Sequence, residues 1–455
     1  MAFSSLFFIF IFLPLAVLAV WFAPQRAKKS LLVLISFLFY AWGSPVNVLY
    51  LAGSILFNYL TGLQLQILRE QGRQKIMRRV LIAAAAADIL LLGLFKYTTA
   101  TMPVGISFYT FSVLSYLFDI WQERAGAQRN LLNLALYVSF FPKITSGPIV
   151  QYADMEKQLD KVKLSRAKFI PGIQLFLVGL VKKVLIADNL GTAFAMITGE
   201  GSLSVLSAWL GMACYSLQLY YDFSGYSDMA IGLAGVFGFE IKPNFNYPYL
   251  SKNISEFWRR WHISLGAWFR QYVYIPLGGN RVAKERLLFN LLVVWLLTGI
   301  WHGSTLNFIV WGLWHGMFVI LERFVIRDRF DRVPRVFRIL VTDIIAFIGW
   351  VFFFSPSLLG ALQYIGQLFG SGGLGLADGT GIYYLTQFAL LLGIAVLGST
   401  KIFRIVIRGV FYENRLHLGE SVLNLITLVG TVLLLVCVVA GLVSSTYQTF
   451  LYFQF

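Results

Sequence analysis

The chain has 455 residues, of which 58% are hydrophobic and only 13% carry a charge. Soluble domains contain about twice that share of charged residues, so this composition excludes an ordinary soluble protein. The formal net charge of +16 suggests a nucleic-acid binder, but the basic residues lie in short segments between apolar runs. The positive-inside rule explains that distribution, so we expect cytoplasmic loops and no nucleic-acid partner.

Apolar runs of about twenty residues recur along the chain, without the alternating polarity of β-barrel strands. They predict an all-α polytopic membrane protein with about 11–12 transmembrane helices. No basic residue precedes the first run, so we expect a retained span with its N-terminus outside, and not a cleaved signal peptide. The predicted spans are 3–23, 31–42, 46–67, 80–98, 104–121, 169–197, 204–237, 287–301, 308–326, 339–355, 383–400 and 421–442.

Connecting segments set the expected topology. Residues 69–79, 157–168 and 327–338 are rich in Lys and Arg and are predicted to be cytoplasmic, whereas the Gly-rich segment 370–381 should lie outside. Residues 130–150 contain Lys143 and a Gly-Pro pair, which favours a re-entrant pair of half-helices over a full span. No long polar linker interrupts the chain, so we expect one integral-membrane domain over residues 1–455.

The polar residues that the apolar runs avoid gather between Tyr220 and Arg281. Polar and ionisable groups are costly within a membrane, so this segment and its surroundings (about residues 215–325) are the predicted catalytic block. Asp222 either caps a helix break or orients an imidazole in a substrate path, and we favour the structural role. The two cysteines, Cys214 and Cys437, lie in apolar runs and are expected to be small packing residues.

Residues 255–275 predict a helix that begins with Ser255 as its cap. Trp258, His262, Leu265 and Phe269 would share one face, and arginines would occupy the others. Aromatic and arginine residues together suit an interfacial helix, or one that dips into a protein-lined cavity. A lipid-surface helix with no part in catalysis remains an open alternative.

The sequence contains four histidines, and His302 is the strongest catalytic candidate. It ends an apolar run and begins a Gly/Ser/Thr/Asn break, where backbone can line a cavity. An imidazole there suits general-base work on a hydroxyl or a thiol. His315, in a second Trp-His-Gly sequence, favours a hydrogen-bonded packing role, and His417 a solvated loop. Metal-ligand spacings are missing from the sequence, so no metal site is expected.

Long motifs then identify a family resemblance. YYDFSGYSDMAIGL begins at Tyr220, NFNYPYLSKNISEFWRRWHISLGAWFRQYVYIPLGGNR at Asn244 and LTGIWHG at Leu297. With FFPKITSGPI at Phe140 and GLVKKVLIADN at Gly179, the chain resembles the membrane-bound O-acyltransferase superfamily nearly from end to end. Within it, the chain is most similar to the alginate O-acetyltransferase branch and its cell-wall relatives.

This resemblance implies a ring of transmembrane helices around a thin central tunnel with re-entrant segments. It places the catalytic histidine at His302 and the family's second polar position at His262. It also implies an acyl thioester donor, such as acetyl-CoA, that approaches from the cytoplasm, with no bound cofactor. The candidate residues of the substrate tunnel or donor path are Asp222, Asn253, Glu256, Trp258, Arg259, Arg260, Trp261, Arg270 and Trp301.

The implied function is transfer of an acetyl group across the bacterial cytoplasmic membrane for O-acetylation of a surface polysaccharide. An extracytoplasmic SGNH-type partner would complete the transfer. A D-alanyl branch directed at teichoic acid is disfavoured by DFSGYSDMAIG and YIPLGGNR. A transporter without chemistry is the other alternative. Residues 370–420 match the family less clearly, so alginate, cellulose, peptidoglycan and other exopolysaccharides all remain open as the polymer.

Overall fold

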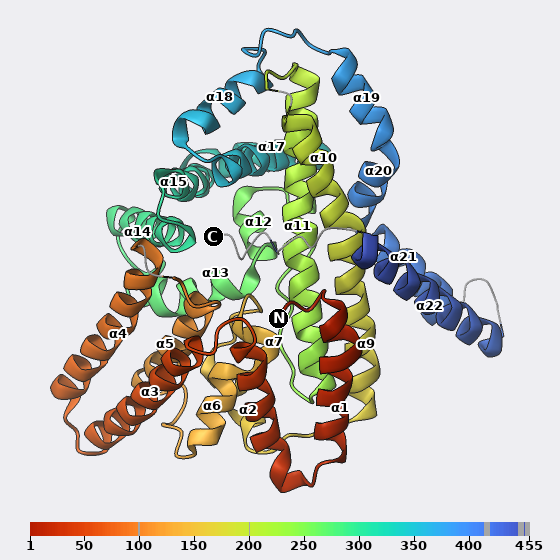
Figure 1. Ribbon diagram of the computed structural model, residues 1–455. Helices are drawn as coiled ribbons and strands as arrows, with labels where there is room; N and C mark the ends of the chain where they lie inside the picture. The colour runs from red at the N-terminus through yellow and green to blue at the C-terminus, as the bar shows by residue number, and fades with distance from the viewer. Residues whose placement is uncertain (99–100, 200, 414–418, 445–449, 451–455) are drawn as a thin grey trace. The chain divides into compact units, whose positions relative to one another are not determined.

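The computed structural model describes residues 1–98, 101–199, 201–413, 419–444 and 450 (Figure 1). The described residues form helices and loops, with no β-strand among them, which confirms the predicted all-α class. The chain divides into two compact units. The first unit holds residues 1–179, 226–243 and 264–277, and the second holds residues 180–225, 244–263 and 278–455. His417 lies outside the described residues.

The first unit contains the N-terminal helices. Its longest pair, α3 and α4, packs as an antiparallel hairpin whose turn contains Gly72 at φ +70° (Figure 1). Glycine is the residue that adopts this left-handed conformation without steric cost. The helices are α1 (Leu13–Phe22), α2 (Gln25–Ala41), α3 (Asn47–Glu70), α4 (Gln74–Tyr97), α5 (Ile106–Trp121), α6 (Leu131–Ser139), α7 (Phe141–Ile144), α8 (Tyr152–Leu159) and α9 (Arg166–Val181).

The predicted re-entrant segment 130–150 forms two short helices, α6 and α7. Asn130 caps α6 by accepting a hydrogen bond from the Leu132 N–H at 2.9 Å, and the helix ends at Ser139 because the backbone of Phe140 is not helical. Lys143 of α7 is buried and donates to the Ser112 hydroxyl at 3.0 Å. Short buried helices of this kind carry backbone into a protein interior without a full span.

The second unit contains both candidate catalytic histidines. Its aromatic core gathers residues from several helices, including Tyr220, Trp261, Trp311 and Trp350. The helices are α10 (Asp188–Thr198), the first part of α11 (Val205–Val236), α12 (Ile254–Arg260), α14 (Lys284–His302), α15 (Leu306–Leu321), α16 (Arg327–Phe330), α17 (Arg335–Phe354), α18 (Leu358–Leu368), α19 (Gly379–Gln387), α20 (Ala389–Gly398), α21 (Ile402–Ile407) and α22 (Glu420–Ser444). Helix α13 (Ile263–Phe269) lies in the first unit from Ser264 onward.

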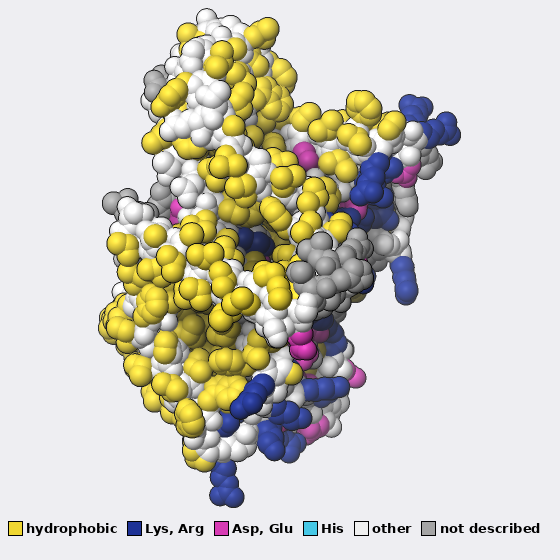
Figure 2. Space-filling view, turned by 90° about the vertical axis from the view of Figure 1, so that its right-hand side faces the viewer, with side chains coloured by type: hydrophobic (Ala, Val, Ile, Leu, Met, Phe, Trp, Pro, Cys, Tyr) yellow, Lys and Arg dark blue, Asp and Glu magenta, His cyan; other side chains and the backbone are white. Residues whose placement is uncertain are grey.

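Exposed apolar side chains mark the membrane surface. Six helices among the described residues are long and apolar enough to cross a membrane, or seven if the bent pair α19–α20 forms one span. Several other expected spans fall on shorter apolar helices, such as Phe8–Phe22. Hydrophobic side chains cover most of the face in Figure 2, while Lys and Arg gather at its edges. The protein is therefore multi-pass, while the implied helix ring and the single domain stay predictions.

Candidate active site

His302 is the last residue of α14. The next residue, Gly303, has extended backbone, and its N–H still bonds to the Gly299 carbonyl at 3.4 Å. Helix α15 begins three residues further on, at Leu306. The Gly-Ser-Thr sequence after His302 disfavours continued helix, because each of these residues has lower helix propensity than alanine. The break therefore lies where the sequence predicted it.

Aromatic rings surround the His302 imidazole. Its ring centroid lies 4.7 Å from Trp301, 4.7 Å from Trp311 and 5.4 Å from Phe353, all at steep interplanar angles. Such edge-to-face contacts are favourable and orient a ring. The residue is only 5% exposed, so the imidazole sits in a largely water-excluded setting. Proton transfer and acyl transfer both benefit when bulk water is kept out.

Two glycines bring α14 and α15 close together beside this histidine. A Cβ at Gly299 would lie 2.5 Å from the Phe308 carbonyl oxygen, and one at Gly312 would lie 2.5 Å from the Trp295 carbonyl oxygen. Both obstacles are backbone atoms, so a side chain at either position would force the helices apart. The close approach lets Trp311 of α15 reach the His302 ring of α14.

His262 lies in the short interruption between helices α12 and α13. The structure therefore corrects the continuous helix predicted for residues 255–275. Helix α12 ends at Arg260, and His262 adopts a left-handed conformation with φ +44°. Asn244 explains the break, because its carbonyl accepts the Ile263 N–H at 2.9 Å. Its side-chain oxygen lies 3.3 Å from His262 Nδ1. The side chain of His262 is therefore held by a loop and not by helical neighbours.

The structure brings the two histidines into one aromatic neighbourhood. The Trp301 ring lies 4.7 Å from His302 and 6.4 Å from His262, so it contacts the first and approaches the second. The Phe223 ring also contacts His262, with 4.7 Å between the two ring centroids. The predicted candidates Trp258 and Trp261 also join this unit's aromatic core.

Polar candidates on α12 stabilise that helix. The Asn253 side chain accepts the Glu256 N–H at 2.7 Å, and Glu256 accepts the Lys252 N–H at 3.0 Å and pairs with Arg260 at 2.6 Å. Burial alone would raise the pKa of Glu256, but these partners outweigh it and hold the pKa below its usual range. Glu322 of the π-helical turn after α15 accepts the Ile254 and Ser255 N–H groups. Asn253, Glu256 and Arg260 thus anchor α12.

Asp222 belongs to a buried ion-pair network. Lys183 Nζ lies 2.6 Å from Asp222 and 2.8 Å from Asp188, and both Lys183 and Asp222 are only 2% exposed. Lys183 occupies a π-helical turn, Lys182–Ala187, between α9 and α10. Charges buried at this depth persist when they are paired, so this arrangement favours the structural role for Asp222. Arg270, the remaining charged candidate, is exposed in the first unit.

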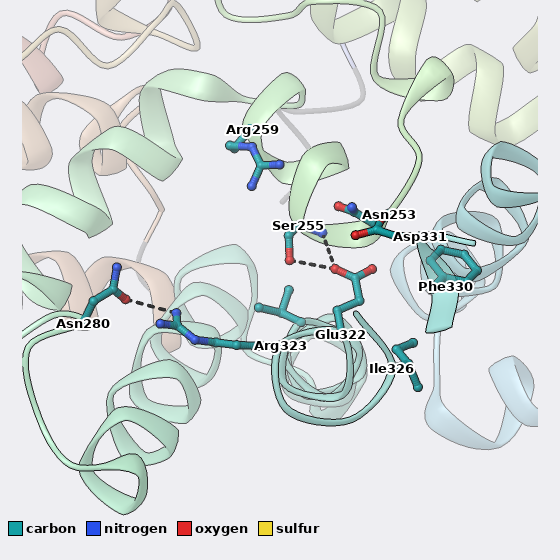
Figure 3. A pocket seen from close by; sticks show the side chains of 10 residues that line it. Asn253, Ser255, Arg259, Asn280, Glu322, Arg323, Ile326, Phe330 and Asp331 are labelled. Carbon is teal, nitrogen blue, oxygen red and sulfur yellow. Dashed lines mark hydrogen bonds between the residues drawn. The ribbon is translucent and has the colours of Figure 1, made fainter. Parts of the chain in front are cut away.

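A polar pocket of about 380 Å³ lies beside α12 and the C-terminal end of α15 (Figure 3). Arg259 and Arg323 line it from different elements, and Arg323 donates to Asn280 at 3.0 Å. Glu322 turns toward Ser255, with a hydrogen bond of 2.7 Å. The remaining lining residues are Asn253, Val319, Ile326, Phe330 and Asp331. Two guanidinium groups in one pocket can pair with an anionic group.

The sequence did not reveal that the second Trp-His-Gly sequence (314–316) packs against the helix that carries His302. His315 is fully buried among tryptophans, and neither ring nitrogen has a hydrogen-bond partner in the described part of the chain. His315 is packed as expected, but the hydrogen bond that we expected with it is not found among the described residues. The echo of GIWHG (299–303) in GLWHG (312–316) was the available signal, because it pairs Gly299 with Gly312 across α14 and α15.

Comparison with known proteins gives the family. The model of the membrane-bound O-acyltransferase family matches residues 51–361. The probable alginate O-acetylase AlgI of Pseudomonas putida is 35% identical over 491 aligned positions, covering 100% of both chains. The peptidoglycan O-acetyltransferase of Helicobacter pylori is 35% identical, covering 82% of this chain and 81% of that protein.

A more distant relative belongs to the D-alanyl branch. The teichoic acid D-alanyltransferase of Bacillus subtilis is 33% identical, covering 49% of this chain and 59% of that protein. The family model spans most of the chain, and it includes His262, His302 and the loop and helices that hold them. The chain therefore belongs to the membrane-bound O-acyltransferase family and is an O-acyltransferase.

Proposed function

We propose that this enzyme takes an acetyl group from a cytoplasmic acyl thioester, such as acetyl-CoA, and delivers it across the bacterial cytoplasmic membrane. The acetyl group then serves O-acetylation of a surface or secreted polysaccharide, with alginate, cellulose and peptidoglycan as candidate polymers. The observation that carries this proposal is the His302 imidazole, held by aromatic rings at the end of α14. The acetyltransferase relatives, which align over more of the chain than the D-alanyltransferase, support acetyl as the group.

His302 has two possible chemical roles in this reaction. As a base, it takes the proton of an acceptor hydroxyl or thiol, the acceptor attacks the thioester carbonyl carbon, and the C–S bond breaks as the thiolate leaves. As a nucleophile, the imidazole nitrogen attacks that carbon itself and holds the acetyl group before passing it on. Rapid quenching with labelled acetyl donor separates the roles, because only the second places label on the protein.

Further components of the reaction are proposed from the family resemblance. An extracytoplasmic SGNH-type protein would receive the acetyl group and transfer it to sugar hydroxyls. His262, Trp301 and the α12 residues would line the donor path, with Arg259 and Arg260 on its cytoplasmic side. The positively charged cytoplasmic segments suit a donor that carries phosphates.

Replacement of His302 tests the proposed function. We expect His302→Ala to abolish polymer acetylation in cells, because the reacting imidazole is gone, while the protein's abundance in the membrane stays unchanged. Immunoblotting of membranes and acetyl analysis of the isolated polymer provide the two measurements. Normal acetylation by this variant would overturn the assignment.

A further inference from the structure

Glu322 is the first residue of a π-helical turn, Glu322–Ile326, that continues α15. Its carboxylate reaches α12, where it accepts the Ile254 N–H, the Ser255 N–H at 2.9 Å and the Ser255 hydroxyl at 2.7 Å (Figure 3). One carboxylate oxygen accepts from Ile254 and the other from Ser255. Single π-helical turns within helices are frequent at functional sites, so this glutamate is a candidate for a role in the reaction.

The carboxylate satisfies two amide groups at the start of α12. The first N–H groups of a helix have no acceptor within that helix, and Ile254 is fully buried. The Asn253 side chain accepts the third of these groups, the Glu256 N–H. Glu322 supplies the acceptors for the first two, and hydrogen bonds to a charged acceptor are about twice as strong as neutral ones.

This contact differs in kind from the other side-chain contacts in α12. Asn253 and Arg260 each bond to Glu256, within four residues along the chain, so they stabilise the helix without fixing its place. Glu322 lies 67 residues beyond Ser255 and belongs to a different element. Helix α12 has seven residues, and helices this short depend on tertiary contacts. The carboxylate therefore fixes the N-terminal end of α12 against the end of α15.

Helices α12 and α15 also meet three residues further along α12. The Trp258 ring centroid lies 5.5 Å from Trp311 and 4.9 Å from His315, and both of these residues belong to α15. Trp311 in turn contacts the His302 ring at 4.7 Å. One contact lets a helix pivot, whereas two contacts at different points fix its direction. The Glu322 contact and the ring contact together set the direction of α12.

The direction of α12 matters because His262 follows the helix after one residue. The Asn246 N–H donates to the Arg260 carbonyl at 2.9 Å, and the Ile263 N–H donates to the Asn244 carbonyl at 2.9 Å. These backbone bonds join the end of α12 to the loop that holds His262. A shift of the helix therefore moves this loop as well.

Resting on the proposed roles of the two histidines, we propose that Glu322 is a positioning residue for acyl transfer. It acts through α12, by holding the first turn of this helix against the end of α15. The contact sets where Trp258 and His262 lie relative to His302. Glu322 thus contributes to the rate of the reaction and not only to the stability of the fold.

Substitution of the carboxylate tests this role. In Glu322→Gln the side chain keeps its length, but an amide nitrogen replaces one acceptor and the charge is lost. The purified variant in liposomes is assayed by thiol release from acetyl-CoA, well below its thermal midpoint. We expect kcat/KM per folded molecule to fall about 10- to 100-fold, because a misplacement of about 1 Å can cost a hundredfold in rate.

Hydrogen exchange measures the position of α12 without reference to the reaction. The Ile254 and Ser255 amides lose a charged acceptor in Glu322→Gln, so exchange in segment 252–263 should accelerate. Glu285→Gln is the control, since it makes the same chemical change at an exposed glutamate of α14. It should leave both kcat/KM and exchange in segment 252–263 unchanged.

A milder variant keeps the test decisive if Glu322→Gln accumulates poorly. Ser255→Ala removes the hydroxyl bond of 2.7 Å and leaves the two backbone bonds to Glu322. We expect kcat/KM to fall about two- to tenfold. In the double variant the two losses should be less than multiplicative, because both changes remove the same contact.

Two outcomes would overturn the positioning role. If Glu322→Gln and Ser255→Ala lower the thermal midpoint but leave kcat and KM unchanged, the contact is purely structural. If exchange in segment 252–263 is unchanged, the carboxylate does not hold α12. A wild type without His302-dependent thiol release would instead reject the proposed donor. Polymer acetylation per amount of membrane protein then replaces thiol release as the rate measurement, so the two failures remain distinct.

Discussion

At the scale of single residues, the two histidines of the site are held by different kinds of contact. Rings from α14, α15 and α17 surround His302 at a helix end. A loop holds His262, through the side chain and backbone of Asn244. The first arrangement places an imidazole where helices meet, and the second fixes a ring within a turn. Different kinetic roles follow from this difference.

Alanine substitutions separate these roles. We expect His302→Ala to lose turnover at every donor concentration, because the reacting imidazole is gone. His262→Ala should recover part of its activity as donor is raised, because a residue on the donor path mainly affects KM. Steady-state kinetics of donor turnover provide the measurement. Complete loss in His262→Ala with unchanged donor affinity would show that both histidines act as one catalytic unit.

Glu256 makes the stability of the folded protein depend on pH. Burial opposes its charge, but the Lys252 N–H and Arg260 hold its pKa below the usual range, so the folded state favours the carboxylate. The resulting stability is present above the unfolded pKa of about 4.3 and is lost as pH falls through the lower folded value. Thermal unfolding of wild type should therefore decline more steeply below about pH 4 than that of Glu256→Gln. Parallel pH curves would contradict this expectation.

At the scale of elements, the contact between α14 and α15 controls the position of His302. Gly312→Ala places a Cβ against the Trp295 carbonyl oxygen, and overpacking of this kind costs about 1–3 kcal/mol. We expect a lower thermal midpoint together with reduced kcat, because the helices separate beside His302. Gly53→Ala in α3 is the control, since nothing lies within 4 Å of the added carbon. Unchanged kcat in Gly312→Ala would show that the site tolerates this movement.

The ion-pair network around Lys183 ties α10 to α11. Lys183→Met leaves Asp188 and Asp222 without their shared cation, and loss of one partner from a buried pair costs about 3–5 kcal/mol. We expect a sharp fall in membrane abundance, measured by immunoblotting. The exposed Lys401 provides a matched control, and Lys401→Met should accumulate normally. Normal abundance of Lys183→Met would contradict a structural role for the network.

Sequence predicted some elements well and others poorly, for physical reasons. The end of helix α14 was predictable to within one residue, because the apolar run of the expected span 287–301 meets a Gly/Ser/Thr break after His302. The break at His262 was not, because it depends on backbone pairing with Asn244, eighteen residues earlier. Lys183 was likewise overlooked, since Asp222 becomes its neighbour only when α11 packs against the helix that carries Lys183 and Asp188.

At the scale of the whole molecule, composition and hydropathy predicted a helical multi-pass protein, and the structure confirms it. The lengths of the individual helices are less predictable, because an apolar run in the sequence does not show where a helix bends. The run at 383–400 forms α19 and α20, which meet at 59°. This bend accounts for one of the differences between the about twelve expected spans and the six or seven candidate spans among the described residues. Another expected span, 3–23, falls on the shorter apolar helix Phe8–Phe22.

The orientation of the protein in the membrane is the last prediction for the whole molecule. Single cysteines are introduced into segments 69–79, 157–168, 327–338 and 370–381, on a background without Cys214 and Cys437. An impermeant reagent added outside should label only 370–381, because Lys and Arg favour the cytoplasmic side. Permeabilised cells provide the control that every introduced thiol is reactive. Strong external labelling at 327–338 would reverse the orientation.

The left-handed backbone of His262 also determines which amino acids position 262 can accept. Glycine, asparagine and aspartate tolerate this conformation, whereas β-branched residues resist it. A saturation library scored for protein abundance should therefore retain Gly, Asn and Asp beside His and deplete Val, Ile and Thr. The same library scored for acetylation at limiting donor should also deplete the residues that fold normally but weaken the donor path. Residues that keep abundance but lose acetylation show which requirements at position 262 come from the reaction and which come from the backbone conformation.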